Sequence, residues 1–223
     1  MALEKRIVCL ANSWKNAGRC IAGKEVLEST YGRWVRPVSN RPSAEISEEE
    51  RNFADGASPE VMDVISIPII SAAPFLYQSE NYVIDSHLYW KRLRTIRWDD
   101  LKYLIDEPDS IWSSGSSRPS DRVPAELASN FITSLMFIEV KELTVLVRPN
   151  DYFKRKVRAK FRYKGKDYNL AVTDPRATTF FLLKPDGEYP LVGAYLCISL
   201  GAEWGGACYK LVATIFSREF YQT

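Results

Sequence analysis

Short runs of apolar residues, many of them alternating with polar ones, recur along the chain and predict strands over most of its length. These runs are rich in Val, Ile, Tyr and Phe and are separated by Gly, Pro and Asn, which is typical of strands joined by turns. The predicted strands cover residues 6–11, 19–26, 32–38, 61–70, 135–140, 143–147, 157–163, 166–172, 194–200 and 209–216. The pattern therefore predicts a mainly β chain.

Helix signals are short and lie between these strands. Ser47 and Glu50 have the spacing of a capping box. Asp174 precedes Pro175, which is the order of an N-cap acid followed by a first-turn proline, and Pro185 ends the segment. Two further short segments are predicted, at 100–105 after the capping candidate Asp99 and at 124–130. The helices are therefore expected to be minor elements.

The second half has a recognisable order of elements. A strand region (135–148) is followed by a hairpin (157–172), a short helix (175–184) and two further strands (194–200 and 209–216). This order, three strands followed by a helix and two strands, is that of an OB-fold barrel. Such barrels bind oligonucleotides on the face of their second and third strands and with neighbouring loops.

The hairpin carries the strongest charge pattern of the chain. Residues 154–166 contain eight basic residues and no acid, in the order KRKVRAKFRYKGK. Because successive strand residues point to opposite faces, one face is cationic and the other apolar. A turn at 164–165 places Phe161 opposite Tyr168, Ala159 opposite Leu170, Val157 opposite Val172 and Arg162 opposite Asp167. The cationic face, formed by Lys156, Arg158, Lys160 and Arg162, suits a polyanion, although basic strands also serve to protect sheet edges and to keep a protein soluble.

Aromatic residues occupy the two loops that flank this face in an OB-fold. The loop at 148–155 contains Tyr152 and Phe153, and the loop at 201–208 contains Trp204. Aromatic side chains beside a basic strand are used to stack the bases of single strands. A closed barrel with a solvated basic face and a structural Trp204 is the alternative.

The first half predicts a second, irregular barrel with a polar loop at 12–18. Lys15 and Arg19 belong to this loop region, together with Asn12, Ser13 and Asn16, and the set could hold a phosphate. An ordinary polar hairpin loop fits the same residues. Arg33 and Arg36 would extend a nucleic-acid track from this barrel if both barrels bind on the same side.

Several segments, taken together, are similar to a prokaryotic family of dual OB-domain proteins. They are ANSWKNAGRCIAGKEV, GRWVRPVS, YQSENYVID, KVRAKFRYKGKDYNLAVTDP and GAYLCISLGAEWGGACYKLVATI. The resemblance spans nearly the whole chain and implies two packed OB-like barrels with short helices, but no reaction. We expect domains at 1–132, with a helical and loop insert, and at 133–223.

Composition limits the classes of function. The formal net charge is only +2, so any electrostatic binding depends on local segregation of charge. Residues 1–41 are basic, residues 42–65 carry seven acids and one arginine, and Lys91, Arg92, Arg94 and Arg97 form another basic cluster. No apolar run is long enough for a membrane span.

The four cysteines occur singly, which favours reduced thiols and a cytoplasmic location, with a Cys197–Cys208 bridge left open. Signals for an enzyme are weak. The chain has one histidine, His87, and neither a phosphate loop nor a dinucleotide fingerprint. Glu139 and Lys141 have the acid-x-Lys spacing of metal-dependent nucleases, which also need a second acid such as Asp63 or Asp121 to hold Mg²⁺. We therefore expect no catalytic residue, cofactor or metal ligand.

The sequence favours a non-catalytic protein that binds nucleic acid, single strands above duplex, with weak sequence preference. Two alternatives stay open: an adaptor that binds a protein partner through the acidic 42–65 segment or the 106–120 loop, and the Mg²⁺-dependent nuclease.

Overall fold

The computed structural model describes residues 3–28, 30–115, 120–149 and 152–221. The chain forms two compact units, Met1–Leu104 and Ile105–Thr223. The domain boundary expected at 132/133 therefore falls inside the second unit, where the segment 105–132 contributes a strand and a short helix. The two units are described separately below.

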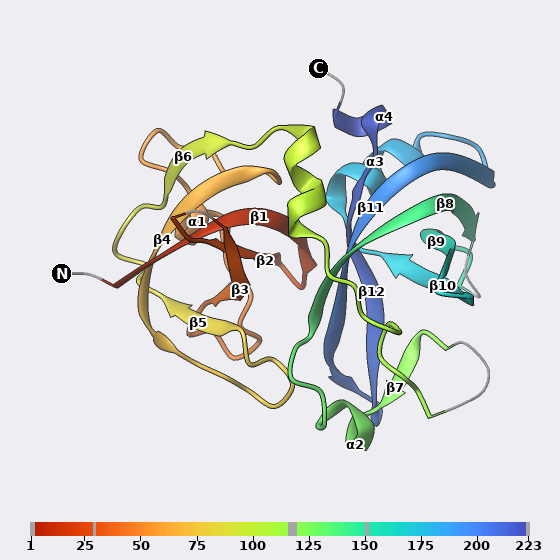
Figure 1. Ribbon diagram of the computed structural model, residues 1–223, viewed down its shortest axis with the longest axis horizontal. Helices are drawn as coiled ribbons and strands as arrows, with labels where there is room; N and C mark the ends of the chain where they lie inside the picture. The colour runs from red at the N-terminus through yellow and green to blue at the C-terminus, as the bar shows by residue number, and fades with distance from the viewer. Residues whose placement is uncertain (1–2, 29, 116–119, 150–151, 222–223) are drawn as a thin grey trace. The chain divides into compact units, whose positions relative to one another are not determined.

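The first unit is a five-stranded barrel with an added edge strand (Figure 1). Its elements are β1 (Leu3–Lys15), β2 (Gly18–Val26), β3 (Tyr31–Val38), α1 (Glu48–Arg51), β4 (Asp63–Ala72), β5 (Asn81–Ile84), β6 (Lys91–Thr95) and the 3₁₀ helix η1 (Trp98–Leu104). The ring runs β1–β2–β3–β5–β4 and closes through pairing of β1 with β4. β3 and β5 are parallel, and β6 adds to β4. The order and the parallel contact are those expected of an OB-fold.

The core of this barrel is aliphatic, with Ile7, Ile21, Ile65 and Ile67 fully buried. Gly23 allows β2 to cross β1 closely, because a Cβ atom there would lie 1.9 Å from the carbonyl oxygen of Val8. The register of β1 and β2 shifts just beyond this point. The close approach and the bulge bend the two strands into a barrel.

The second unit repeats the same topology (Figure 1). Its elements are β7 (Arg122–Pro124), α2 (Ala125–Ala128), β8 (Leu135–Pro149), β9 (Arg155–Tyr163), β10 (Lys166–Val172), α3 (Pro175–Leu182), β11 (Gly187–Trp204), β12 (Ala207–Phe216) and α4 (Arg218–Tyr221). The ring runs β8–β9–β10–β12–β11 and returns to β8, with β10 and β12 parallel. β7 extends the sheet beyond β12. The prediction of a mainly β chain with two OB-like barrels and short helices is confirmed.

The capping signals in the sequence correspond to real helix starts. Ser47 and Glu50 form a reciprocal capping box at α1. The Asp174 carboxylate accepts hydrogen bonds from the backbone N–H groups of Arg176 and Ala177, and Pro175 opens α3. The Asp174 carboxylate also accepts from the Ile215 N–H, so that this buried acid fixes α3 to β12.

The cysteines, all within the described residues, are free thiols, so Cys197 and Cys208 are not bridged. Three are buried and Cys20 is partly buried. Burial raises the pKa of Cys9 well above its ordinary value.

Candidate nucleic-acid interface

The β9–β10 hairpin has the register that the sequence predicted. Phe161 pairs with Tyr168, Ala159 with Leu170 and Arg162 with Asp167 across a turn at 164–165. Lys164 and Gly165 both have positive φ, as a two-residue hairpin turn requires. Phe161 and Tyr168 are buried and stacked at a centroid separation of 5.5 Å. These two aromatic residues therefore belong to the core and not to a binding surface.

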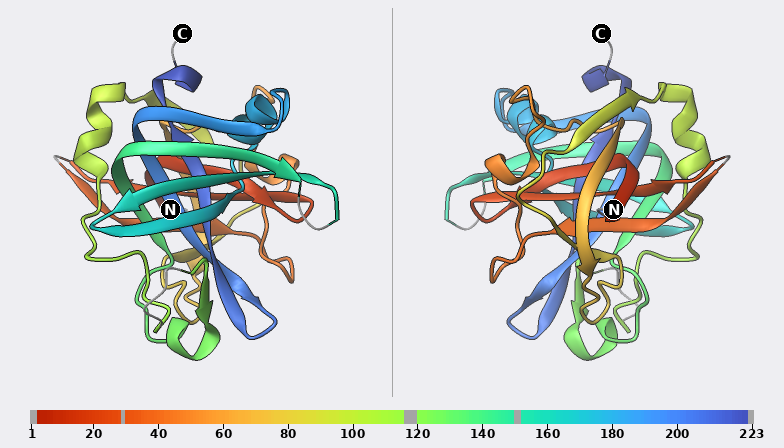
Figure 2. Two further views of the ribbon diagram at one scale, coloured as in Figure 1. Left: turned by 90° about the vertical axis from the view of Figure 1, so that its right-hand side faces the viewer. Right: turned by 90° about the vertical axis from the view of Figure 1, so that its left-hand side faces the viewer.

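The four alternating cations lie on the opposite face of β9. Lys156, Lys160 and Arg162 are exposed, and Arg158 is partly buried. Figure 2 (left) shows β8, β9 and β10 side by side on the side of the unit that faces the viewer. The sequence therefore predicted both the cationic strand and its partition into an apolar and a charged face.

Acidic groups neutralise part of this face, and only Asp167 was predictable from the hairpin register. Asp121, from the segment before β7, pairs with Arg158 at 2.8 Å, and Asp167 lies 3.9 Å from Arg162. Arg158 also donates to Asn169 of β10. Lys156 and Lys160 have no ion-pair partner among the residues that the structure describes. They are the two cations best able to bind a new anion.

A groove of about 700 Å³ lies over this face. Leu146 of β8 lines it, between Arg158 of β9 on one side and Glu188 of β11 on the other. Arg148 pairs with Glu188 at one end, and Asp121 pairs with Arg158. The volume is in the range of sites for small molecules or single nucleotide units.

The loop aromatics are strongly exposed, as a stacking role requires. Tyr152 is 81% exposed, Phe153 89% and Trp204 75%. Figure 2 (left) shows the β11–β12 hairpin projecting at the lower right. Residues 150 and 151 of the first loop lie outside the described residues. Phe153 has φ of +56°, a conformation that non-glycine residues seldom adopt and that is often found at binding loops.

A two-residue turn presents Trp204. Trp204 pairs with Ala207, and the intervening Gly205 and Gly206 have φ of +60° and +79°. Both values are in the region that a type I′ hairpin turn needs and that glycine adopts without strain. The centroids of the Trp204 and Tyr209 rings lie 6.1 Å apart. The Arg122 guanidinium also lies over the Tyr209 ring, 5.3 Å from its centroid. The indole is thus supported from one side by an aromatic neighbour.

Arg155 has a structural role. Its Nε lies 2.6 Å from Asp186, and its other nitrogens donate to the carbonyl oxygens of Leu182 and Lys184. These are carbonyls at the C-terminal end of α3, where a cation is favourable. Arg155 therefore anchors the start of β9 to α3 and does not count among the cations available to a ligand.

Lys210 of β12 is a buried cation close to two residues that line the groove, Tyr168 and Asp121. It is 3% exposed, lies 5.8 Å from the Tyr168 ring centroid, and faces Asp121 and Lys166. Burial lowers the pKa of Lys210 from 10.5 to about 8, with Asp121 opposing the change and Lys166 adding to it. No pattern in the sequence indicates a role for this group, which lies in a mainly apolar strand.

The lowered pKa predicts how stability changes with pH. Above about pH 8 the folded state releases this proton, whereas the unfolded chain keeps it up to about 10.5. Because the unfolded state binds more protons there, the contribution of Lys210 to the free energy of unfolding rises from pH 8 to 10.5. Urea unfolding at pH 7.5 and 9.5 checks this, with Lys210→Met as the comparison. An equal change in the free energy of unfolding between the two pH values in both proteins would contradict the lowered pKa of Lys210.

The predicted residues of the first unit divide into exposed and buried groups. Arg19 lies over the Trp14 ring at 3.7 Å, Lys15 is partly buried with its pKa lowered by burial, and Arg33 is exposed. Arg36 is 4% exposed and its Nη2 lies 3.3 Å from Glu80. A cation in that position cannot contact a phosphate, so Arg36 leaves the proposed interface.

The polar loop at 12–18 also has fewer free donors than its sequence indicates. The Asn12 amide donates to the carbonyl oxygen of Pro59, and the Ser13 hydroxyl donates to that of Cys20. The Ser13 bond lies within the β1–β2 hairpin, and the Asn12 bond connects β1 to the segment before β4. A phosphate site in this loop stays a prediction that rests on Lys15 and Arg19.

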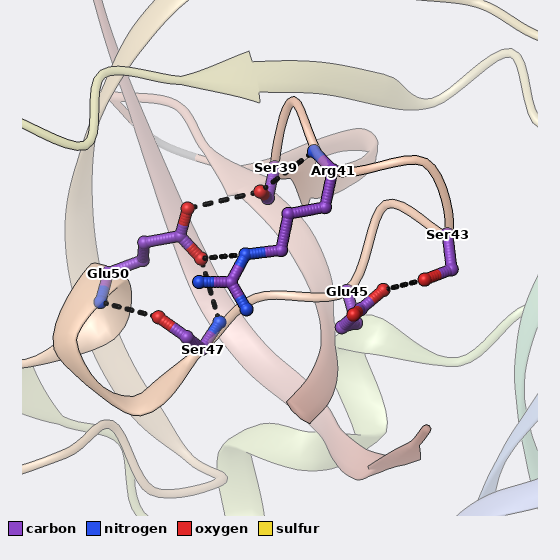
Figure 3. Close-up of polar contacts among 6 residues, drawn as sticks. All are labelled: Ser39, Arg41, Ser43, Glu45, Ser47 and Glu50. Carbon is purple, nitrogen blue, oxygen red and sulfur yellow. Dashed lines mark hydrogen bonds and ion pairs between the residues drawn. The ribbon is translucent and has the colours of Figure 1, made fainter. Parts of the chain in front are cut away.

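Three of the seven acids in segment 42–65, Glu45, Glu50 and Asp63, are engaged by side chains of their own unit (Figure 3). Glu50 accepts hydrogen bonds from the Ser39 hydroxyl and the Ser47 N–H, and lies 3.6 Å from Arg41. Figure 3 also shows Ser43 donating to Glu45. Asp63 accepts from Thr95. These three carboxylates stabilise the connection between β3 and β4, whereas the other four acids of the segment are exposed: Glu48, Glu49, Asp55 and Glu60.

The candidate nuclease residues are not gathered into a metal site. Glu139 and Lys141 are exposed on β8, Asp121 is paired with Arg158, and Asp63 is buried beneath Thr95. Within the described residues, no group of three or more His, Cys, Asp or Glu side chains could hold a metal ion. His87 is exposed in a loop of the first unit. Among the residues that the structure describes, no helix is long and apolar enough to cross a membrane.

The model of the family described as dual OB-containing domain matches residues 5–215. The chain belongs to this family. The match spans both barrels, in agreement with the repeated ring of the structure.

Other comparisons add little to this family assignment. A search of curated proteins found no match. Among solved structures, the crystal structure of the tetrameric p202 HIN2 is similar at 8% identity over 96% of this chain and 91% of that one, with a TM-score of 0.33. A score this low supports no statement about fold or function.

Proposed function

We propose that this dual OB protein binds single-stranded nucleic acid on the β9–β10 face of its second barrel. The observation that carries the proposal is the coincidence of an OB ring, a cationic outer strand and exposed loop aromatics in one unit. OB-folds bind oligonucleotides on the equivalent face and with the equivalent loops. The protein acts as a binder, without catalysis.

The residues have distinct roles in this proposal. Lys156 and Lys160 contact phosphates, and Arg158 and Arg162 assist from positions beside Asp121 and Asp167. Exposed aromatic side chains stack on bases, which a single strand offers and a duplex does not. The stacking residues are Tyr152, Phe153 and Trp204. Lys15, Arg19 and Arg33 of the first barrel are proposed as additional contacts.

Fluorescence anisotropy of a labelled oligothymidylate, titrated at about 50 and 200 mM salt, tests the proposal. We expect binding that weakens steeply with salt. The slope of log K against log salt should fall by about 1.4 in the Lys156→Ala/Lys160→Ala variant, since each single-strand phosphate contact contributes about 0.7. The matched control is Lys102→Ala/Lys141→Ala, which removes two exposed lysines outside the proposed interface.

Each alternative gives a different outcome in the same assay. No anisotropy change at low salt and high protein concentration would overturn the proposal and favour a protein partner. Mg²⁺-dependent shortening of the probe that Glu139→Gln abolishes would favour the nuclease. Binding of a duplex probe as tightly as the single strand would contradict the role of the stacking residues.

A further inference from the structure

The outer face of the second barrel is an ordered grid of side chains around one apolar position. Leu146 lies directly across the strand ladders from Glu188 and from Arg158. In the next row along the face, Lys160 of β9 pairs with Thr144 of β8 on one side and with Asn169 of β10 on the other. Leu146 is only 9% exposed, and it gives the groove an apolar patch surrounded by polar groups.

Arg158 is held in a fixed orientation beside this patch. Its Nε donates to Asn169 Oδ1 at 2.9 Å, and its Nη2 donates to Asp121 Oδ2 at 2.8 Å and to the Asn169 carbonyl. Within the described residues, Nη1 of Arg158 and Oδ1 of Asp121 make no hydrogen bond. The ion pair therefore leaves one donor group and one acceptor atom unused. A side chain with three such bonds is preorganised for recognition, since little rotamer freedom remains to be lost on binding.

The charges around the groove balance. Its lining contains three cations, Arg148, Arg158 and Lys160, and three acids, Asp121, Asp167 and Glu188. A phosphate placed inside would meet carboxylates within the same small volume, which is unfavourable. A neutral, flat molecule with both donors and acceptors fits this lining better, with its ring against Leu146. The phosphates then remain outside the groove, near the exposed cations Lys156, Lys160 and Arg162.

We propose that this groove is a subsite for one guanine base within the bound strand, an inference that rests on the proposed function. Guanine has acceptors at O6 and N7 and donors at N1 and N2. Arg158 can donate to O6 and N7 through its unused Nη1 group, and arginine on this edge of guanine is the commonest specific contact of a side chain with a base. Asp121 can accept from N1–H and the N2 amino group. Adenine lacks the keto oxygen and the N1 proton, and cytosine lacks the ring N–H donor.

The test uses labelled oligothymidylates that carry one central guanine, inosine or adenine, or none. We expect the wild-type protein to bind the guanine probe at least tenfold more tightly than the all-thymine probe. The inosine probe, which lacks the N2 amino group, should lie between them. In Asp121→Asn this preference should fall to about twofold or less. Asp109→Asn is the matched control, because it removes an exposed acid paired only distantly with Lys164, at 3.7 Å.

The outcomes separate this inference from the proposed function. Equal affinity for all probes, or a preference for adenine, overturns the guanine subsite and leaves nucleic-acid binding standing. A full guanine preference in Asp121→Asn overturns the role of Asp121. Failure to bind any probe overturns both proposals. Should the Asp121 variant not fold, the comparison of guanine with inosine on the wild-type protein decides the question alone.

Discussion

Replacing Asp174 with alanine is expected to lower the free energy of unfolding of the second unit by about 3 kcal/mol, the sum of a lost N-cap and an unsatisfied buried N–H. The Asp174 carboxylate is 4% exposed and accepts from the backbone N–H groups of Arg176 and Ala177 at the start of α3. It also accepts from Ile215 of β12 at 2.9 Å. Alanine removes all three acceptor contacts at once.

Urea unfolding monitored by circular dichroism checks this value. Ser47→Ala is the matched control, because Ser47 also caps a helix, but with one bond of 3.3 Å to the Glu50 N–H. We expect a loss of about 1 kcal/mol there, within the usual range for a cap. A loss in Asp174→Ala no larger than that of Ser47→Ala would show that the bond to Ile215 contributes nothing.

The pKa of Asp174 shapes the pH dependence of this contribution. Burial raises the pKa, while the three backbone N–H groups oppose the increase. A carboxyl with a raised pKa binds its proton more tightly in the folded state, so its ionisation lowers stability as pH rises through the folded value. The acid is retained because its oxygens satisfy N–H groups that would otherwise be buried without partners.

The sequence predicted those parts of the fold that depend on local pattern. The β9–β10 register followed from alternation and a Lys164-Gly165 turn, and the start of α3 followed from Asp174 and Pro175. Both signals act over a few residues. The second barrel was also predictable, because its strands are long and its order of elements is distinctive.

Elements whose stability comes from distant partners were missed. β5 is four residues long, and β6 is the exposed segment KRLRT, which pairs only with β4. The NYVI segment of β5 is too short to stand out as a strand, and β6 contains a single apolar residue, Leu93. Residues 187–192 of β11 were missed because Pro190 interrupts them. There β11 pairs only with β8, and an edge position tolerates a proline, which has no N–H to donate.

The charge pattern was predictable, but its neutralisation was not. The run at 154–166 has no acid in sequence, yet Asp121 and Asp186 reach Arg158 and Arg155 from segments more than thirty residues away. The available positive charge is therefore smaller than a count of the run indicates. Long-range pairing of this kind depends on the tertiary fold, which periodicity and spacing do not encode.

Arg36 is expected to contribute to stability and not to binding. Arg36 and Glu80 are 4% and 3% exposed, with Nη2 and Oε1 3.3 Å apart. Replacing Arg36 with methionine removes the guanidinium that faces the buried Glu80 carboxylate, and breaking a buried ion pair in this way costs about 3 to 5 kcal/mol. Where the variant is folded, its affinity for the oligothymidylate probe should equal that of the wild type, because a buried side chain cannot meet the strand.

Two variants give this prediction a sharp test. Arg33→Met changes an exposed cation on the same strand and should alter the free energy of unfolding by less than about 0.5 kcal/mol. Arg36→Met/Glu80→Met removes both buried charges and should recover most of the lost stability, since an apolar pair can replace a buried ion pair. A double variant as unstable as Arg36→Met would mean that the arginine stabilises the barrel through packing instead of charge. A weaker affinity for the probe in folded Arg36→Met would return Arg36 to the nucleic-acid interface.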